Sequence, residues 1–101
     1  DFSGLERMSD AHKAFYPVTD KVEAFGWHVL ECDGHDGEAL YDTASSRCKN
    51  KPTFIICKTV KGKGVSFMEN VPIWHYRSPN KMEYAQALDE IDDDERYDKE
   101  L

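Results

Sequence analysis

Two short stretches of the sequence carry side chains that could do chemistry. The first is KGKG at residues 61–64, in which lysine alternates with glycine. Glycine permits positive φ and close backbone approach, so the N–H groups of such a turn can bind an anion, and lysine adds a point charge suited to phosphate. The pattern differs from GxxxxGK[ST], the phosphate-binding P-loop. On this pattern alone, an anion-binding loop and a solvated basic turn both remain open.

The second stretch is the pair Trp74-His75, which follows the apolar residue Ile73. We expect the imidazole of His75 to lie against this apolar wall. In such surroundings a neutral ring can donate or accept a hydrogen bond near physiological pH, which is the requirement for acid–base or polarising chemistry. A histidine with a purely structural role is the alternative.

A third polar segment, DGHD at residues 33–36, contains His35 between two aspartates. His35 could line the same edge of the fold as the basic loop, or it could order the loop that leads into Asp36. No two histidines, and no histidine and cysteine, have the spacing of a zinc site. We therefore predict no metal ligands in this chain.

Two apolar segments that read as strands position these clusters. Residues 27–32 (WHVLEC) are rich in strand formers, and residues 53–60 (TFIICKTV) have a continuously apolar core, as in a strand buried on both faces. A strand, a helix and a second strand make a right-handed crossover between parallel strands. Ligands of such sheets bind beyond the carboxyl ends of the strands, so residues 33–36 and 61–64 are expected at the same edge.

Three helices are expected around these strands. Apolar spacing predicts the first at residues 18–25, with Gly26 as the left-handed residue at its C-terminus. The second is expected over residues 36–48, with an aspartate as its N-cap. The third begins at Asn80, which can form a capping box with Glu83. Because two strands are too few for a stable sheet, the fold class is α/β: a partial parallel sheet, or three-layer α/β/α fragment.

Composition limits the class of protein. The chain has 101 residues and a net charge of −7. Residues 88–101 contain eight acidic and two basic residues. We therefore predict a domain over residues 1–88 and an acidic tail or linker over residues 89–101. An acidic chain is a poor reader of nucleic acid, and no apolar run approaches the ~18 residues that cross a membrane.

The cysteines and the first residue also carry expectations. Three cysteines without a C-x-x-C pair indicate buried, reduced thiols in a cytoplasmic protein. The chain begins with Asp1 instead of methionine, so processing or a fragment is expected.

Three segments taken together, AFGWHVLECDGHD, KPTFIICKTVKGKGVSFMEN and WHYRSPN, resemble the thiamine-diphosphate domain of transketolases. The likeness is greatest to the separately encoded N-terminal subunits of split transketolases, and it runs over about residues 21–88. It implies the C-terminal half of a thiamine-diphosphate-binding fold. It also implies a transferase of carbohydrate metabolism, in the pentose phosphate pathway, that moves a two-carbon ketol unit between sugar phosphates.

The resemblance carries over to single positions. His75 matches the family histidine that lies near the cofactor and hydrogen-bonds the donor substrate, which implies a catalytic role. Lys61 matches a lysine that contacts the cofactor in some members, while Gly62 and Gly64 would shape the cofactor-binding loop. Many relatives have glycine after the histidine, where this chain has Tyr76 and Arg77, and this bulk is expected to change the mouth of the pocket and the preferred sugar.

Other parts of the family pattern do not occur in this sequence. The family holds Mg²⁺ and the diphosphate with GDG and a later asparagine, and residues 1–4 resemble the segment just after that asparagine. The metal ligands are therefore expected outside this chain. The resemblance implies as partners the rest of the domain and a subunit with the pyrimidine domain, in a dimeric assembly. We expect the chain alone to bind thiamine diphosphate and Mg²⁺ poorly and to be inactive.

Two alternatives stay open at this point. Deoxyxylulose-phosphate synthase shares the DGHD and KGKG elements and a later histidine, although VSFMEN followed by Trp74-His75 favours transketolase. A non-catalytic module, which serves only as an assembly partner, is the other.

Overall fold

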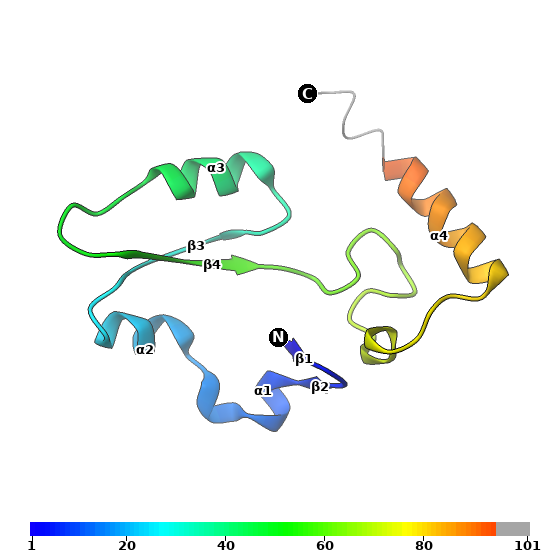
Figure 1. The fold of residues 1–101 in the computed structure, drawn as a ribbon, viewed down its shortest axis with the longest axis horizontal. Helices are drawn as coiled ribbons and strands as arrows, with labels where there is room; N and C mark the ends of the chain where they lie inside the picture. Colours follow the sequence, from blue (N-terminus) through cyan, green and yellow to red (C-terminus); the bar gives the residue numbers. More distant parts are fainter. Residues whose placement is uncertain (95–101) are drawn as a thin grey trace. The chain divides into compact units, whose positions relative to one another are not determined.

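The computed structural model describes residues 1–94, which have the mixed helices and small parallel sheet of an α/β fragment (Figure 1). Residues Met8–Thr59 form one compact unit. Residues Asp1–Arg7 and the described residues from Val60 on form another. The two units are described separately below. No helix among residues 1–94 is both long and apolar enough to span a membrane.

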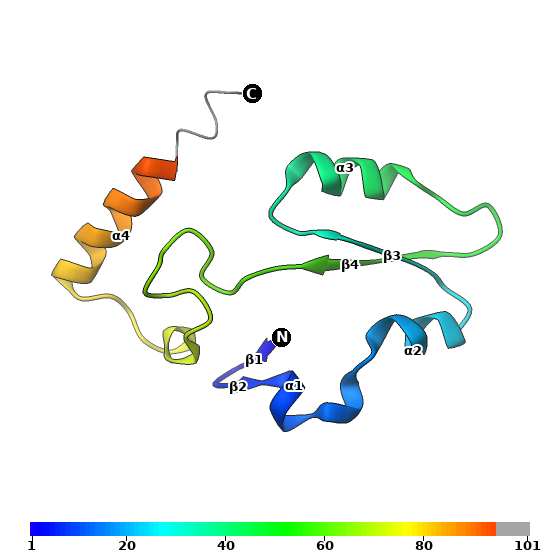
Figure 2. The same ribbon diagram turned by 180° about the vertical axis from the view of Figure 1, so that it is seen from behind.

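The first unit contains the predicted strand pair. Its elements, in chain order, are α1 (Met8–Ala11), the 3₁₀ helix η1 (Lys13–Phe15), α2 (Val18–Ala24), β3 (His28–Asp33), α3 (Gly37–Ser45) and β4 (Thr53–Lys58). β3 and β4 pair in parallel, in register from His28 opposite Thr53 to Asp33 opposite Lys58. In both views α3 and α2 lie on opposite sides of this pair (Figures 1 and 2). The predicted parallel crossover is confirmed.

The ends of α2 and α3 follow local rules. Gly26 has φ 92°, and the N–H groups of Gly26 and Trp27 donate to carbonyls of the last turn of α2, which is the Schellman arrangement. At the start of α3, Asp36 Oδ1 accepts from the Ala39 N–H at 3.1 Å. Both predicted caps are confirmed.

Two predicted boundaries are wrong. α3 ends at Ser45 and does not reach Cys48, because the hydroxyls of Ser45 and Ser46 donate to backbone carbonyls one turn back and compete with continuation of the helix. β4 ends at Lys58, two residues before the predicted end, and the Lys58 carbonyl accepts the Gly34 N–H at 2.8 Å.

The strand pair is also more exposed than the sequence predicts. Phe54 is 37% exposed even though its ring packs edge-to-face on Trp27, with centroids 5.8 Å apart. Cys57 is exposed, while Cys32 and Cys48 are half-buried, so the prediction of buried thiols is wrong for Cys57. The reason is that, among residues 1–94, α2 and α3 pack mainly against β3 and leave the faces of β4 less covered.

The second unit contains a short hairpin, a long turn and the last helix. Its elements are β1 (Phe2–Ser3), which pairs antiparallel with β2 (Glu6–Arg7), the 3₁₀ helix η2 (Pro72–His75) and α4 (Lys81–Asp94). The two buried residues of the described chain, Val65 and Ala87, lie in the turn and in α4, and are 7% and 8% exposed. Neither the hairpin nor η2 was predicted.

α4 runs past Leu88, while the predicted division into domain and tail stays a prediction. The helix continues to Asp94, so the boundary placed after Leu88 falls inside it. Glu90 explains the extension, because its carboxylate accepts both the N–H and the hydroxyl of Ser66 at 2.6 Å and so fixes the helix beyond Leu88. The rest of the predicted tail, residues 95–101, lies outside the described residues.

Candidate functional site

The basic loop folds as a tight turn that requires its glycines. Gly62 and Gly64 have φ of 79° and 97°, a region that other residues rarely adopt. A Cβ on Gly62 would lie 2.6 Å from the carbonyl oxygen of Met68, so the backbone itself excludes a side chain there. The turn is closed by the Asn70 N–H, which donates to the Lys61 carbonyl at 2.9 Å.

The backbone donors of this turn are largely in use. The N–H groups of Lys63 and Val65 donate to carbonyls within the turn, and the Gly64 N–H donates to Glu69 Oε1 at 3.2 Å. A carboxylate of the chain thus occupies the place that an external anion would take at Gly64. The contribution left to Gly64 is the shape of the turn, and attraction for an anion comes from the lysine ammonium groups.

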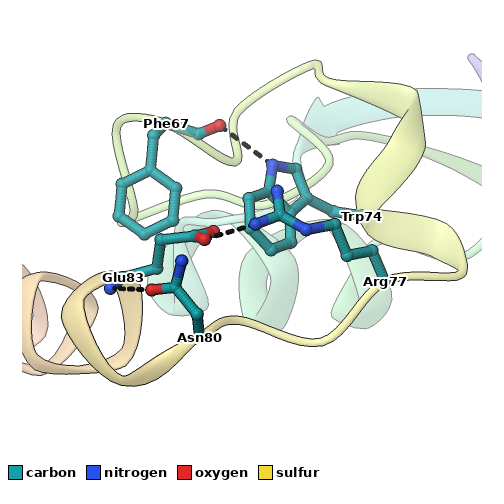
Figure 3. Close-up of polar contacts among 5 residues, drawn as sticks. All are labelled: Phe67, Trp74, Arg77, Asn80 and Glu83. Carbon is teal, nitrogen blue, oxygen red and sulfur yellow. Dashed lines mark hydrogen bonds and ion pairs between the residues drawn. The ribbon is translucent and has the colours of Figure 1, made fainter.

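Trp74 anchors η2 to this turn. Its indole Nε1–H donates to the Phe67 carbonyl at 3.1 Å, and the two rings meet edge-to-face with centroids 5.5 Å apart. The guanidinium of Arg77 lies over the indole, 4.4 Å from the ring centroid (Figure 3). This three-residue stack was not predicted; its sequence signal is an aromatic residue seven positions before a tryptophan, which periodicity does not single out.

Arg77 also links the stack to the start of α4. Its guanidinium forms an ion pair with Glu83, and Asn80 Oδ1 accepts the Glu83 N–H at 2.9 Å (Figure 3). The Asn80 half of the predicted capping box is therefore confirmed. The Glu83 carboxylate is directed to Arg77, so the segment between η2 and α4 is held by side chains from both ends.

His75 faces different surroundings from those predicted. In a 3₁₀ helix consecutive side chains point about 120° apart, so the packing of Trp74 on Phe67 directs the neighbouring His75 elsewhere. The imidazole is exposed and meets the ring edge of Tyr76, with centroids 4.6 Å apart. The expected apolar wall of Ile73 and Trp74 is thus replaced by a single tyrosine ring.

The turn and η2 bring Lys61 and His75 together. Lys61 Nζ lies 3.5 Å from His75 Nδ1, across fourteen residues of sequence. A lysine ammonium can only donate, so Nδ1 accepts in this contact when the ring is the tautomer with its proton on Nε2. The resulting Nε2–H is a hydrogen-bond donor on an exposed ring, beside a fixed positive charge. Such a pair suits an anionic or oxygen-rich ligand.

The two aspartates of the DGHD segment accept hydrogen bonds from the backbone and so have a structural role. Asp33 Oδ1 accepts the His35 N–H at 2.9 Å, and Asp36 caps α3. The backbone N–H of His35 therefore takes part in the loop, while both roles predicted for its side chain stay open. Among residues 1–94 no group of three or more His, Cys, Asp or Glu side chains could hold a metal ion.

Comparison with known proteins identifies the family of the chain and leaves the roles of Lys61 and His75 as predictions. The family model of the transketolase thiamine diphosphate binding domain matches residues 10–88. One of the subunits of apulose-4-phosphate transketolase from Actinobacillus succinogenes is 43% identical over 79 residues, covering 77% of this chain and 29% of that protein. The protein of the same name in Phocaeicola vulgatus is 40% identical over 76 residues, covering 73% and 27%.

A human relative extends the likeness to a longer protein. Transketolase-like protein 2 is 46% identical over 68 residues, which cover 65% of this chain and 11% of that protein. The chain therefore spans less than a third of the length of the curated relatives described here. Because the family model covers most of its residues and the parallel β3–β4 pair agrees with the fold, this chain belongs to the family of the transketolase thiamine diphosphate binding domain.

Proposed function

We propose that this chain is part of a transketolase that transfers a two-carbon ketol unit from a ketose phosphate to an aldose. Family membership supports the class of enzyme. The observation that carries the proposal is the 3.5 Å approach of Lys61 Nζ to His75 Nδ1, because it places a positive charge and a defined hydrogen-bond donor together. Thiamine diphosphate, when bound, supplies the carbanion chemistry of the reaction.

His75 is the residue proposed to act on the substrate. With Nδ1 occupied by Lys61, the Nε2–H is free to donate to an oxygen of the donor sugar and to stabilise charge that develops there. The ring of Tyr76 meets the imidazole edge-to-face. The same tyrosine adds bulk beside the histidine, so it is expected to restrict which sugars reach the ring.

Lys61 is the residue proposed to contact the cofactor, on a turn shaped by Gly62 and Gly64. Its ammonium has further N–H groups besides the one directed to His75, and these can donate to diphosphate oxygens. The Mg²⁺ that accompanies the diphosphate in the complete enzyme would be held by residues outside this chain.

The remaining parts of the enzyme are proposed as partners. Relatives named as single subunits of a transketolase support a split, multi-subunit assembly. We propose that this chain works with the rest of the cofactor domain and with a subunit that carries the pyrimidine domain, as a dimer in the cytoplasm, in pentose phosphate metabolism. Isothermal calorimetry of the chain alone should show no micromolar binding of thiamine diphosphate with Mg²⁺. Micromolar binding would contradict its dependence on these partners.

The decisive experiment is His75→Ala in the reconstituted enzyme. Removing a positioned hydrogen-bond donor is expected to lower kcat/KM for ketol transfer about a hundredfold. His12→Ala, which removes an exposed histidine of the other unit, should leave kcat/KM within about twofold and serves as the control. Near wild-type activity of His75→Ala would refute the proposed role. Supplying pyruvate with glyceraldehyde phosphate in place of a ketose phosphate tests for the deoxyxylulose-phosphate synthase reaction.

A non-catalytic assembly module is the second candidate, and exposed apolar side chains favour it. Phe25 and Met82 are each 83% exposed and Tyr41 is 74% exposed, which is surface that a partner could cover. The two functions separate in one measurement. A module predicts that His75→Ala changes neither assembly nor turnover, whereas the transketolase proposal predicts intact assembly with lost turnover.

A further inference from the structure

Two of the three cysteines stand opposite each other across the parallel strand pair. Cys32 in β3 and Cys57 in β4 are direct partners in the register. Partners in register project to the same side of a sheet, so both thiols lie on one face, opposite to the face of Glu31. Both are free cysteines; Cys57 is exposed and Cys32 is half-buried. A reagent in solution can therefore reach the pair through Cys57.

The spacing of paired strands suits a bond between these two residues. Neighbouring strands lie about 4.8 Å apart, and disulfides are found at Cα separations of about 4.4–6.8 Å. Cys32 also acts on the Cys57 thiol and raises its pKa, as expected of two thiols that are close neighbours. Linking the sulfurs therefore needs side-chain rotation and little movement of the backbone.

Cys48 offers an internal comparison. It is half-buried like Cys32, but it lies between α3 and β4. It is therefore outside the β3–β4 register and stands opposite no other cysteine there. Reactivity that depends on the strand pairing should therefore include Cys32 and Cys57 and omit Cys48.

We propose that Cys32 and Cys57 form a dithiol modification site, which reacts with small disulfides of the glutathione class and closes to a cross-strand disulfide. In the first step the Cys57 thiolate attacks one sulfur of oxidised glutathione, whose S–S bond breaks and releases one glutathione thiolate. In the second step the Cys32 thiolate attacks the Cys57 sulfur of this mixed disulfide and releases the second glutathione. The two protein thiols are oxidised, the glutathione disulfide is reduced, and the two thiol protons pass to the released glutathiones or to solvent.

The chemistry of Cys57 sets the conditions for the reaction. Desolvation raises the pKa of its thiol, and the hydrogen bond and charge interaction with Cys32 raise the pKa further. Less thiolate is therefore present at neutral pH, and the first step is expected to accelerate as the pH is raised. The reaction with oxidised glutathione should therefore be measured at mildly alkaline pH.

The experiment exposes the full chain to excess oxidised glutathione and follows it by intact mass and by peptide mapping without reduction. We expect the wild type to lose the mass of two hydrogen atoms and to yield peptides linked through Cys32 and Cys57. Cys48→Ser should behave in the same way. Cys32→Ser should lose this product and retain a glutathione adduct on Cys57, because no thiol remains to displace it.

The opposite results are equally definite. A wild-type chain that keeps a stable glutathione adduct on Cys57, or that links Cys48 to either strand cysteine, would overturn the proposal. Circular dichroism of each variant shows that the chain retains its fold. The site depends on the β3–β4 register and not on the proposed transketolase function, so either one can fail while the other stands.

Discussion

Residues 33–36 and residues 61–75 both follow a strand and both contain polar candidate residues, yet they use these side chains differently. In the first segment the Asp33 and Asp36 carboxylates accept backbone N–H groups and build the loop and the cap of α3. In the second the backbone closes the turn by itself, and the side chains of Lys61 and His75 are directed to each other. The lesson is that a polar cluster becomes a candidate site only when the backbone does not need its polar atoms.

The first prediction tests whether the backbone of the turn at residues 61–70 depends on Gly62. Gly62→Ala should lower the free energy of unfolding by about 2–3 kcal/mol, because it adds the cost of positive φ to a clash with the Met68 carbonyl. Urea unfolding followed by circular dichroism measures the loss. Gly26→Ala is the matched control, since it has φ 92° but nothing within 4 Å of the added Cβ, and it should cost about 1–2 kcal/mol. Equal losses would show that the Met68 contact contributes nothing.

The second prediction separates the charge of the loop from its shape. In the reconstituted enzyme, Lys61→Met should raise the thiamine diphosphate concentration for half-maximal activity about ten- to a hundredfold, since a charge-assisted hydrogen bond contributes about 1.5–3 kcal/mol. Lys61→Arg keeps the charge and should lose less. Lys63→Met removes an equal charge from the same turn without the contact to His75 and is the control. An equal effect of the two methionine variants would indicate a general electrostatic field in place of a specific contact.

The third prediction sharpens the structural role of residues 33–36. Asp36→Ala should lower the free energy of unfolding by about 1 kcal/mol through loss of the N-cap, and Asp36→Ser should retain most of it. Urea unfolding of the chain measures both. Once assembled, the enzyme carrying Asp36→Ala should keep its kcat. A fall in kcat comparable to that of His75→Ala would mean that this loop takes part in the chemistry.

Local patterns predicted the parts of the fold that local interactions determine. The caps at Gly26 and Asp36 are confirmed because each depends on residues within one helical turn. The parallel pairing is confirmed because strand, helix and strand in that order admit little else. The continuation of α4 past Leu88 was not predicted for the opposite reason, since Glu90 accepts hydrogen bonds from Ser66 in a distant part of the sequence.

In the candidate site, too, some features could be predicted from the sequence and others depend on distant contacts. The resemblance named Lys61 and His75, and the structure places them 3.5 Å apart, while their roles stay predictions. The surroundings of His75 could not be predicted, because they depend on Trp74 packing against Phe67 and on a 3₁₀ helix that no periodicity marks. The engagement of Gly64 by Glu69 is likewise a contact within a turn whose shape only the folded chain defines.

The smallest expected effect concerns the contact that holds α4 to the turn. The two hydrogen bonds from Ser66, first that of its hydroxyl and then that of its backbone N–H, lower the pKa of Glu90 below the ordinary glutamate value of 4.5. Because the pKa is lower in the folded than in the unfolded chain, the stabilisation is complete above the unfolded pKa. It is lost as the pH falls through the folded pKa. Both partners are accessible to solvent, so the effect on stability is modest.

Carboxyl-carbon NMR titration of the wild type and of Ser66→Ala tests this contact at Glu90 itself. The variant loses the hydroxyl and keeps the backbone N–H, so the pKa of Glu90 should rise part of the way towards its ordinary value. Glu31 is the internal control in the other unit, because the Thr19 hydroxyl and Lys58 lower its pKa independently of Ser66. A Glu90 titration that is unchanged in Ser66→Ala would show that the hydroxyl does not hold α4. Movement of Glu31 in the same variant would show that the two units do not titrate separately, so the comparison between them would fail on electrostatic grounds.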